Sequence, residues 1–265
     1  MIQSLHPVRG FALATLGSIV VALPSWSGAD EAAQQLVDEM IVAHGGMANW
    51  KAAETAYFED QWTYQGGQKG PLSKITVDQR TRRAYHDYTE MDATVVWDGE
   101  KAWSTNWAMP MPPRFLATLN YYFLNLPWLA KDPGVRLATE APRRLPDDAT
   151  EYLTVRVTYE AGVGDTPDDY YVLYIDPVRK MLKACEYIVT YQAILPEGVE
   201  HSPPHVLIYE TFATVNGLLV PTAFTIYEEG EFYAGCEIAN WSFDGVFDEG
   251  RMIRPEGAVV DTSQP

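Results

Sequence analysis

The stretch LATLNYYFLNLPWLA, residues 116–130, carries no charged side chain, although the 265-residue chain has a formal net charge of −17. It follows the helix-breaking run MPMPP at residues 109–113. Around it, apolar residues recur at the three- and four-residue steps of one helix face. They are Phe115, Leu116, Leu119, Tyr122, Phe123 and Leu126, with Arg114, Thr118, Tyr121 and Asn125 on the other face. We predict an amphipathic helix that ends at Pro127 and packs on a sheet.

The segments on both sides of this helix have the period of two that is typical of strands, from Thr55 to about residue 245. Turn signals such as Asn216-Gly217 separate them into about 11 strands of one meander. So many twisted antiparallel strands must curl, split or close. A second helix, over residues 30–46, also has an apolar face to bury. The sequence therefore predicts an α+β fold: a strongly curved antiparallel sheet, an unclosed β-barrel, with helices covering its concave face. A closed barrel is the alternative.

The first 29 residues have the pattern of a secretory signal peptide. Arg9 precedes the apolar run Phe11–Leu23, and small residues around Ala29 suit a cleavage site. A retained membrane anchor is the alternative, but the run is shorter than the ~20 residues of a membrane span. We predict a periplasmic or secreted product that begins near Asp30 and is soluble after cleavage. Residues 30–245 would form one domain, and residues 246–265 a C-terminal tail.

Charge and cysteine content narrow the possible partners. Removal of the leader deletes one base and no acid, which leaves a net charge of −18 and disfavours nucleic acid as a partner. Cys185 and Cys236 would meet an oxidising compartment, so a disulfide is permitted. A simple meander separates them by two strands, too far to bridge unless the sheet curves strongly. The disulfide stays an open question.

Catalytic and metal-binding patterns are scarce. The sequence lacks the hydrolase, phosphate-loop, dinucleotide and zincin motifs. His201 and His205 are joined by a proline-containing loop that does not hold both rings on one face, so we predict no metal site and no cofactor. We interpret His44 as a helix C-terminal residue favoured by the helix dipole and His86 as an exposed or half-buried strand residue. Adjacent acids, such as the pairs at 59–60 and 168–169, are interpreted as solvated surface because neighbours on a strand face opposite ways.

Aromatic side chains gather in the strands and in the inserted helix. An ordinary core accounts for many of them, and a lined hydrophobic cavity is the functional alternative. Our candidate ligand-binding residues are Phe58, Trp62, Trp97, Trp103, Phe115, Leu119, Tyr122, Phe123, Leu126 and Trp128.

Five segments together resemble the exported lipoprotein-carrier family of LolA and its relatives, including LolB. They are AHGGMANWKAAETAYFE (43–59), VVWDGEKAWS (95–104), YYFLNLPWLAKDPG (121–134), YYVLYIDPVRKMLKACEY (170–187) and GLLVPTAFTIY (217–227). The resemblance covers about residues 30–245. It implies an unclosed barrel with helices as a lid over an apolar trough for acyl chains, and a carrier rather than an enzyme. It also implies a lipoprotein or lipid as cargo and a possible membrane-bound donor or acceptor protein.

We therefore expect a monomeric carrier or binding protein for acyl chains, lipids or lipoproteins, with residues 115–126 as its lid. The first alternative is an exported enzyme that acts on a hydrophobic substrate through His201, His205 or Glu210. The second is a structural domain whose trough is filled and binds nothing. An empty volume of several hundred Å³ beneath residues 113–129 would separate a binding protein from the filled domain.

Overall fold

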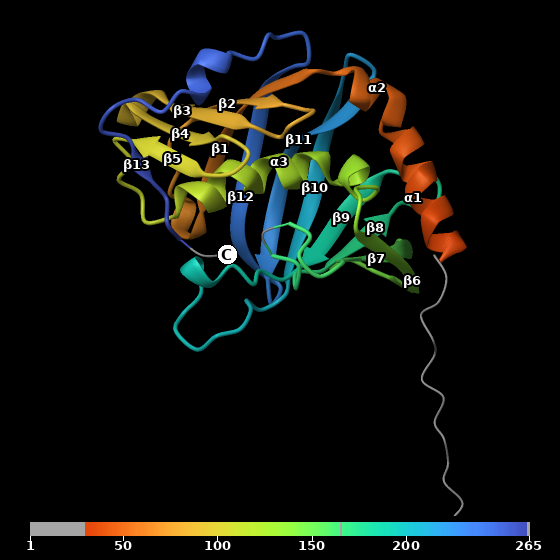
Figure 1. Ribbon diagram of the computed structural model, residues 1–265. Coiled ribbons are helices and arrows are strands. Elements are labelled where there is room, and N and C mark those ends of the chain that lie inside the picture. Colours follow the sequence, from red (N-terminus) through yellow and green to blue (C-terminus); the bar gives the residue numbers. More distant parts are fainter. Residues whose placement is uncertain (1–29, 165, 264–265) are drawn as a thin grey trace, which may run out of the picture.

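The structure is a computed structural model that describes residues 30–164 and 166–263. The predicted signal peptide lies outside the described residues. One sheet of 13 strands dominates the described part, and it is accompanied by α1 (Glu31–Ala43), α2 (Met47–Ala52) and α3 (Pro113–Leu129) (Figure 1). Among the described residues there are also four short 3-10 turns: η1 (Gln65–Gly67), η2 (Thr89–Met91), η3 (Gln192–Ile194) and η4 (Glu249–Met252).

Every strand pair in the sheet is antiparallel, as predicted. The strands are β1 (Thr55–Tyr64), β2 (Ser73–Asp78), β3 (Ala84–Tyr88), β4 (Ala93–Trp97), β5 (Ala102–Thr105), β6 (Val135–Arg143), β7 (Tyr152–Tyr159), β8 (Tyr171–Ile175), β9 (Leu182–Tyr187), β10 (His205–Val215), β11 (Leu218–Glu228), β12 (Glu231–Ser242) and β13 (Val259–Val260). The sheet is not closed, because β13 and β6 form its two edges. The unclosed α+β architecture is confirmed, and the strand count exceeds the predicted number by two.

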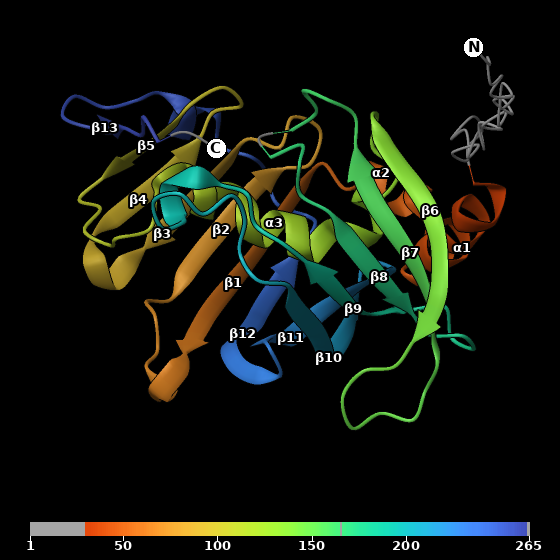
Figure 2. The ribbon, with the colours of Figure 1, turned by 90° about the horizontal axis from the view of Figure 1, so that it is seen from below.

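The prediction of one continuous meander is wrong. β1 pairs with β12, so the order across the sheet is β13-β5-β4-β3-β2-β1-β12-β11-β10-β9-β8-β7-β6. α3 therefore connects β5, near one edge, to β6 at the other. The sheet between them would measure ~50 Å if it were flat, at ~4.8 Å per strand step. The 17-residue helix is only about 25 Å long, and curvature brings the two halves of the sheet toward each other around it (Figure 2).

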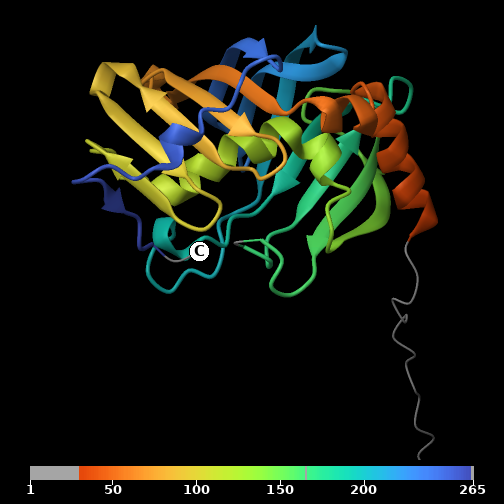
Figure 3. The ribbon, with the colours of Figure 1, turned by 45° about the horizontal axis from the view of Figure 1, so that its top comes forward.

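α3 lies across the inside of the curved sheet, between the β2–β4 side and the β7–β9 side (Figures 2 and 3). It ends at Leu129, so the predicted stop at Pro127 is wrong. Proline lacks the N–H that would donate to the carbonyl four residues earlier, which is that of Phe123. The hydroxyl of Tyr209, on β10, donates to this carbonyl instead, at 2.5 Å. The tertiary contact supplies the missing hydrogen bond and lets the helix continue.

Burial differs between the two halves of α3. Phe115, Leu116 and Leu119 in the first half are only half-buried, whereas every residue from 123 to 130 is buried. The predicted polar positions Tyr121 and Asn125 are buried as well, so the simple amphipathic interpretation is wrong for the second half. Asn125 accepts a hydrogen bond from the Trp50 indole at 2.9 Å, and the Trp50 ring stacks on Trp128. The second half of α3 is thus fixed in the core.

His44 caps the C-terminus of α1, but in a neutral form. Its Nδ1 lies 2.9 Å from the Leu219 carbonyl on β11, and its Nε2 accepts from the Leu182 N–H at 3.0 Å, just inside β9. Burial lowers the pKa of His44 to about 4. The ring therefore joins α1 to two strands as an uncharged donor and acceptor, in place of the favourable charge–dipole contact that we predicted.

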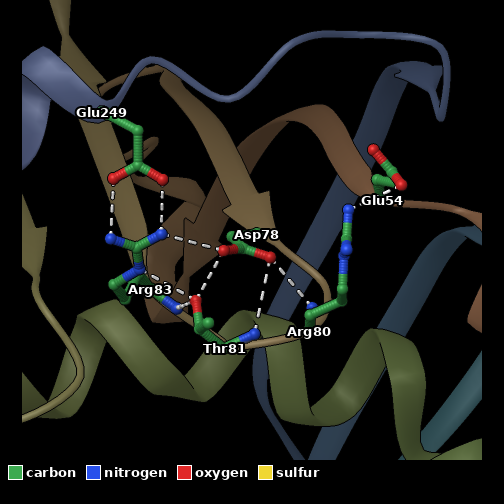
Figure 4. Close-up of polar contacts among 6 residues, drawn as sticks. All are labelled: Glu54, Asp78, Arg80, Thr81, Arg83 and Glu249. Atoms are coloured by element: carbon green, nitrogen blue, oxygen red, sulfur yellow. Dashed lines mark hydrogen bonds and ion pairs between the residues drawn. The ribbon is translucent and has the colours of Figure 1, made fainter.

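The segment that we predicted as a C-terminal tail adds β13 to the edge of the sheet, beside β5. Both oxygens of Glu249 accept from the Arg83 guanidinium, which also contacts Asp78 and Thr81 (Figure 4). Phe247 and Met252 of the same segment pack with the cluster that contains Trp103.

Cys185 on β9 and Cys236 on β12 are buried free thiols. β10 and β11 lie between them, as the predicted strand order requires. The curvature of the sheet does not bring the two sulfur atoms together.

Candidate functional site

A partly enclosed cavity of about 370 Å³ lies against α3. One wall is α3, and another comes from β6–β9 and the connections around them. Trp97 on β4 and Arg82, between β2 and β3, complete the lining. Its lining comprises Arg82, Trp97, Phe115, Ala117, Thr118, Leu119, Tyr121, Tyr122, Phe123, Leu129, Asp132, Pro133, Val135, Tyr159, Val163, Gly164, Thr166, Asp169, Tyr171, Tyr187, Val189 and Tyr191. The volume lies within the range of small-molecule sites, ~300–1,000 Å³.

Aromatic contacts connect the helical wall of this cavity to the sheet wall. The ring of Tyr122 lies 5.0 Å from that of Tyr171, on β8. The Phe123 ring lies 4.9 Å from that of Tyr187, on β9. Such pairs contribute ~0.5–1.5 kcal/mol each beyond their buried area. They are contacts that a ligand entering between helix and sheet would have to replace.

Five of the ten predicted ligand-binding residues line the cavity: Trp97, Phe115, Leu119, Tyr122 and Phe123. The structure brings these five together from β4 and α3. Four of them lie on one face of α3, and the helical period of the sequence therefore predicted them. The fifth, Trp97, lies on β4, beside the first half of the helix.

The other five are not part of the lining. Phe58 is fully buried against Trp241, with ring centroids 4.6 Å apart, and Trp62 packs on Phe224 at 5.4 Å. Leu126 and Trp128 are buried in the second half of α3. Trp103 packs beneath the C-terminal segment. An alternating pattern shows which residues share a strand face, but it does not show which part of that face a helix already fills.

The residues of the β7–β9 wall were not among the ligand-binding residues predicted from the sequence. Tyr159, Tyr171 and Tyr187 lie on three neighbouring strands and line the cavity together. Burial raises the pKa of each of these phenols well above 10, so all three are neutral. The predicted meander already places these strands side by side. The alternating sequence did not indicate that these three side chains face α3.

Three charged residues lie in the lining. Arg82 Nη2 contacts Asp132 Oδ2 at 2.5 Å, so these two charges neutralise each other. Asp169 is buried, in contrast to the predicted solvated surface, and accepts from Thr166 Oγ1 at 2.7 Å and from the backbone and side chain of Thr190 at 2.8 Å. Burial nevertheless raises its pKa. Among the described lining residues no base remains without an acidic partner.

A second group of polar side chains lies under the first half of α3. We call it the polar layer: Asp60 on β1, Ser73 on β2, His86 on β3 and Asn120 on α3. All four are buried, so Asp60 is not the surface residue and His86 not the exposed or half-buried residue that we predicted. Asp60 and Ser73 are directly opposed across β1 and β2. Burial raises the pKa of Asp60 to about 7 and lowers that of His86 to about 4.

The other candidate sites give weaker support for a function. His201, His205 and Glu210 do not line the cavity, and His205 contacts Glu228 at 3.1 Å. Within the described residues, no group of three or more His, Cys, Asp or Glu is placed to hold a metal ion. A wider hollow of about 720 Å³, between the outer side of α1 and Arg179–Lys180, is shallow and open to solvent. Over residues 30–164 and 166–263, no helix combines the length and apolarity needed to cross a membrane.

Comparison with known proteins supports the fold. No family model matches the sequence, and no curated protein does. A DUF1329 family protein from Desulfovibrio piger superposes with a TM-score of 0.52 at 10% identity, over 83% of this chain and 97% of its own. A LolA superfamily protein from Nitrosomonas europaea gives a TM-score of 0.51 at 8% identity, over 84% of this chain and 97% of its own.

These two similarities and the unclosed sheet around α3 define the class of structure. The chain has a LolA-like fold, as the sequence resemblance implied.

Proposed function

We propose that this chain is an exported carrier or binding protein for acyl chains, lipids or lipoproteins, and not an enzyme. The observation that carries the proposal is the largely apolar and aromatic cavity of about 370 Å³ against α3, within a LolA-like fold. The volume disfavours the alternative of a structural domain with a filled trough. The enzyme alternative loses support because its candidate residues do not meet at the cavity.

The size of the cavity limits what fits without movement. At the ~30 Å³ that a water molecule occupies in the liquid, 370 Å³ holds roughly a dozen non-hydrogen atoms. That number suits one medium-length chain. Several acyl chains would require α3 to move away from the sheet and act as a lid. Each buried CH₂ contributes ~0.8 kcal/mol, so a long chain can offset the aromatic contacts that the helix gives up.

The first half of α3 is the part suited to such movement. It is half-buried and rests partly on the polar layer, whereas the second half is held by Trp50, Tyr209 and the surrounding core. Buried polar contacts weaken a helix–sheet interface relative to apolar ones, because water can satisfy the same groups once they are exposed. We therefore place the hinge near residue 121.

The test is lipid analysis together with dye binding. Mass spectrometry of protein purified from its native compartment should find acyl-containing molecules, and an uncharged environment-sensitive dye should bind. Leu119→Trp fills the cavity and should abolish dye binding. Leu219→Trp is the matched control, since Leu219 is also half-buried but is not part of the lining. Absence of both lipid and dye binding, or equal binding by the two variants, would contradict the proposal.

A further inference from the structure

The described part of the cavity wall offers a ligand no base that lacks an acidic partner. Arg82, the single base among the described lining residues, is already paired with Asp132. The remaining charged residue is the acid Asp169. Its oxygens accept three hydrogen bonds from two threonines, and no cation is among these partners. A carboxylate that entered would have to compete with Asp132 for Arg82, and an ionised Asp169 would repel it.

Because the cavity is partly shielded from water, a ligand carboxylate without a counter-ion would be strongly disfavoured there. Moving an unpaired carboxylate out of water costs far more than moving an uncharged amide or hydroxyl, and like charges repel more strongly where water is excluded. The chain as a whole adds a field of the same sign, with a formal net charge of −17. An anionic end group is therefore disfavoured both at the wall and on approach.

Uncharged polar groups, by contrast, can be satisfied there. The hydroxyls of Tyr122 and Tyr159 are buried in the lining and have no hydrogen-bond partner among the described residues. A phenol can both donate and accept. A carbonyl or amide that entered beside them would pair with groups that are otherwise unsatisfied.

We infer that the cavity selects single-chain amphiphiles of about ten carbons whose end group is an uncharged hydrogen-bonding one, such as an amide, ester or alcohol, and rejects the corresponding carboxylates. This inference rests on the proposed function, because it names the ligand class of the same cavity. The chain length follows from the room for roughly a dozen non-hydrogen atoms.

Decanamide and decanoate test the selection directly, because they have the same number of non-hydrogen atoms and differ in charge. Decanoate is ionised at pH 8, because this pH lies well above the pKa of ordinary carboxyl groups, which is ~4. Displacement of the uncharged dye from the full-length protein should show decanamide binding at least tenfold more tightly. Equal or tighter binding of decanoate overturns the inference and leaves the proposed function standing. If neither compound binds although lipid co-purifies, the inference also fails. If neither binds and no lipid is found, the proposed function fails.

Two variants locate the cause of the selection. Asp169→Asn removes the unpaired acid from the wall and should raise decanoate affinity severalfold. Asp168→Asn changes the net charge equally, but this exposed residue is not part of the lining, so decanoate affinity should stay unchanged. Equal effects of the two variants would contradict a role for the wall. If the Asp169→Asn variant does not fold, the comparison of decanamide with decanoate on the unmodified protein still tests whether the cavity rejects carboxylates.

Discussion

The side-chain amide of Asn120, on α3, donates a hydrogen bond to the carboxyl group of Asp60, on β1, with both side chains buried. The second carboxyl oxygen of Asp60, Oδ1, and the amide oxygen of Asn120, Oδ1, have no hydrogen-bond partner among the described residues. An unsatisfied buried polar group costs ~1–3 kcal/mol. The first half of α3 is therefore held by a contact that is both specific and weak.

The first prediction concerns the pH dependence of stability through Asp60. Its pKa is about 7 in the folded chain against 3.8 for an ordinary aspartate, and burial is the main cause. The folded state binds this proton more tightly, so its stabilising effect is complete below pH 3.8 and is lost as the pH rises to about 7. Asp60→Asn removes the ionisation. Relative to the unmodified protein, the variant should gain stability across this window, by roughly 4 kcal/mol in total.

Urea unfolding at pH 5 and pH 8 measures this difference. Glu59→Gln is the control, because Glu59 is the adjacent residue on β1 but lies on the opposite strand face, where it accepts from Asn240. It should not reproduce the gain. A constant difference between Asp60→Asn and the unmodified protein at both pH values would show that Asp60 does not titrate in this way.

The second prediction concerns how the Asp60–Asn120 contact affects ligand exchange. Asn120→Leu alone should destabilise the protein by ~1–3 kcal/mol, because it leaves a buried carboxyl group without its donor. Changing both residues to Leu removes both polar groups, and should restore or exceed the original stability. If α3 is a lid, the double variant should also release the bound dye more slowly. Stopped-flow dye release measures the rate, and faster release would contradict the lid.

The strands and the long helix could be predicted from the sequence because their periods of two and 3.6 are local. Asp60 also had a local signal: it lies between Phe58 and Trp62 on β1, and side chains two residues apart share a strand face. Treating it as half of the acidic pair 59–60 hid that signal.

The pairing of β1 with β12 had no comparable local signal, because it joins segments about 180 residues apart. The position of the β7–β9 wall relative to the β2–β4 side of the sheet depends on that pairing, and so does the contact between Arg82 and Asp132. Pro127 illustrates the same limit: the residue alone predicts a helix stop, and only the distant Tyr209 hydroxyl overrides it.

The third prediction concerns His44. Its pKa is about 4 in the folded chain against 6.5, because burial disfavours the charged ring. Its contribution to stability is complete above pH 6.5 and is lost as the pH falls toward 4, by roughly 3 kcal/mol. His44→Gln should therefore cost most at pH 7 and much less at pH 4.5 in urea unfolding. His201→Gln, at an exposed position, should cost little at either pH. A pH-independent cost of His44→Gln would contradict the neutral cap.

The last prediction couples Tyr209 to Pro127. Tyr209→Phe removes the hydroxyl that donates to the Phe123 carbonyl and should cost ~1–3 kcal/mol, because Pro127 has no N–H to replace it. Pro127→Ala restores a backbone N–H four residues after Phe123, so the same loss should cost clearly less in that background. A double-mutant cycle by chemical unfolding measures the coupling. Tyr233→Phe, at an exposed position, is the control and should be nearly neutral. Additive costs for Tyr209→Phe and Pro127→Ala would mean that the two residues act independently, and the continuation of α3 past Pro127 would then need another cause.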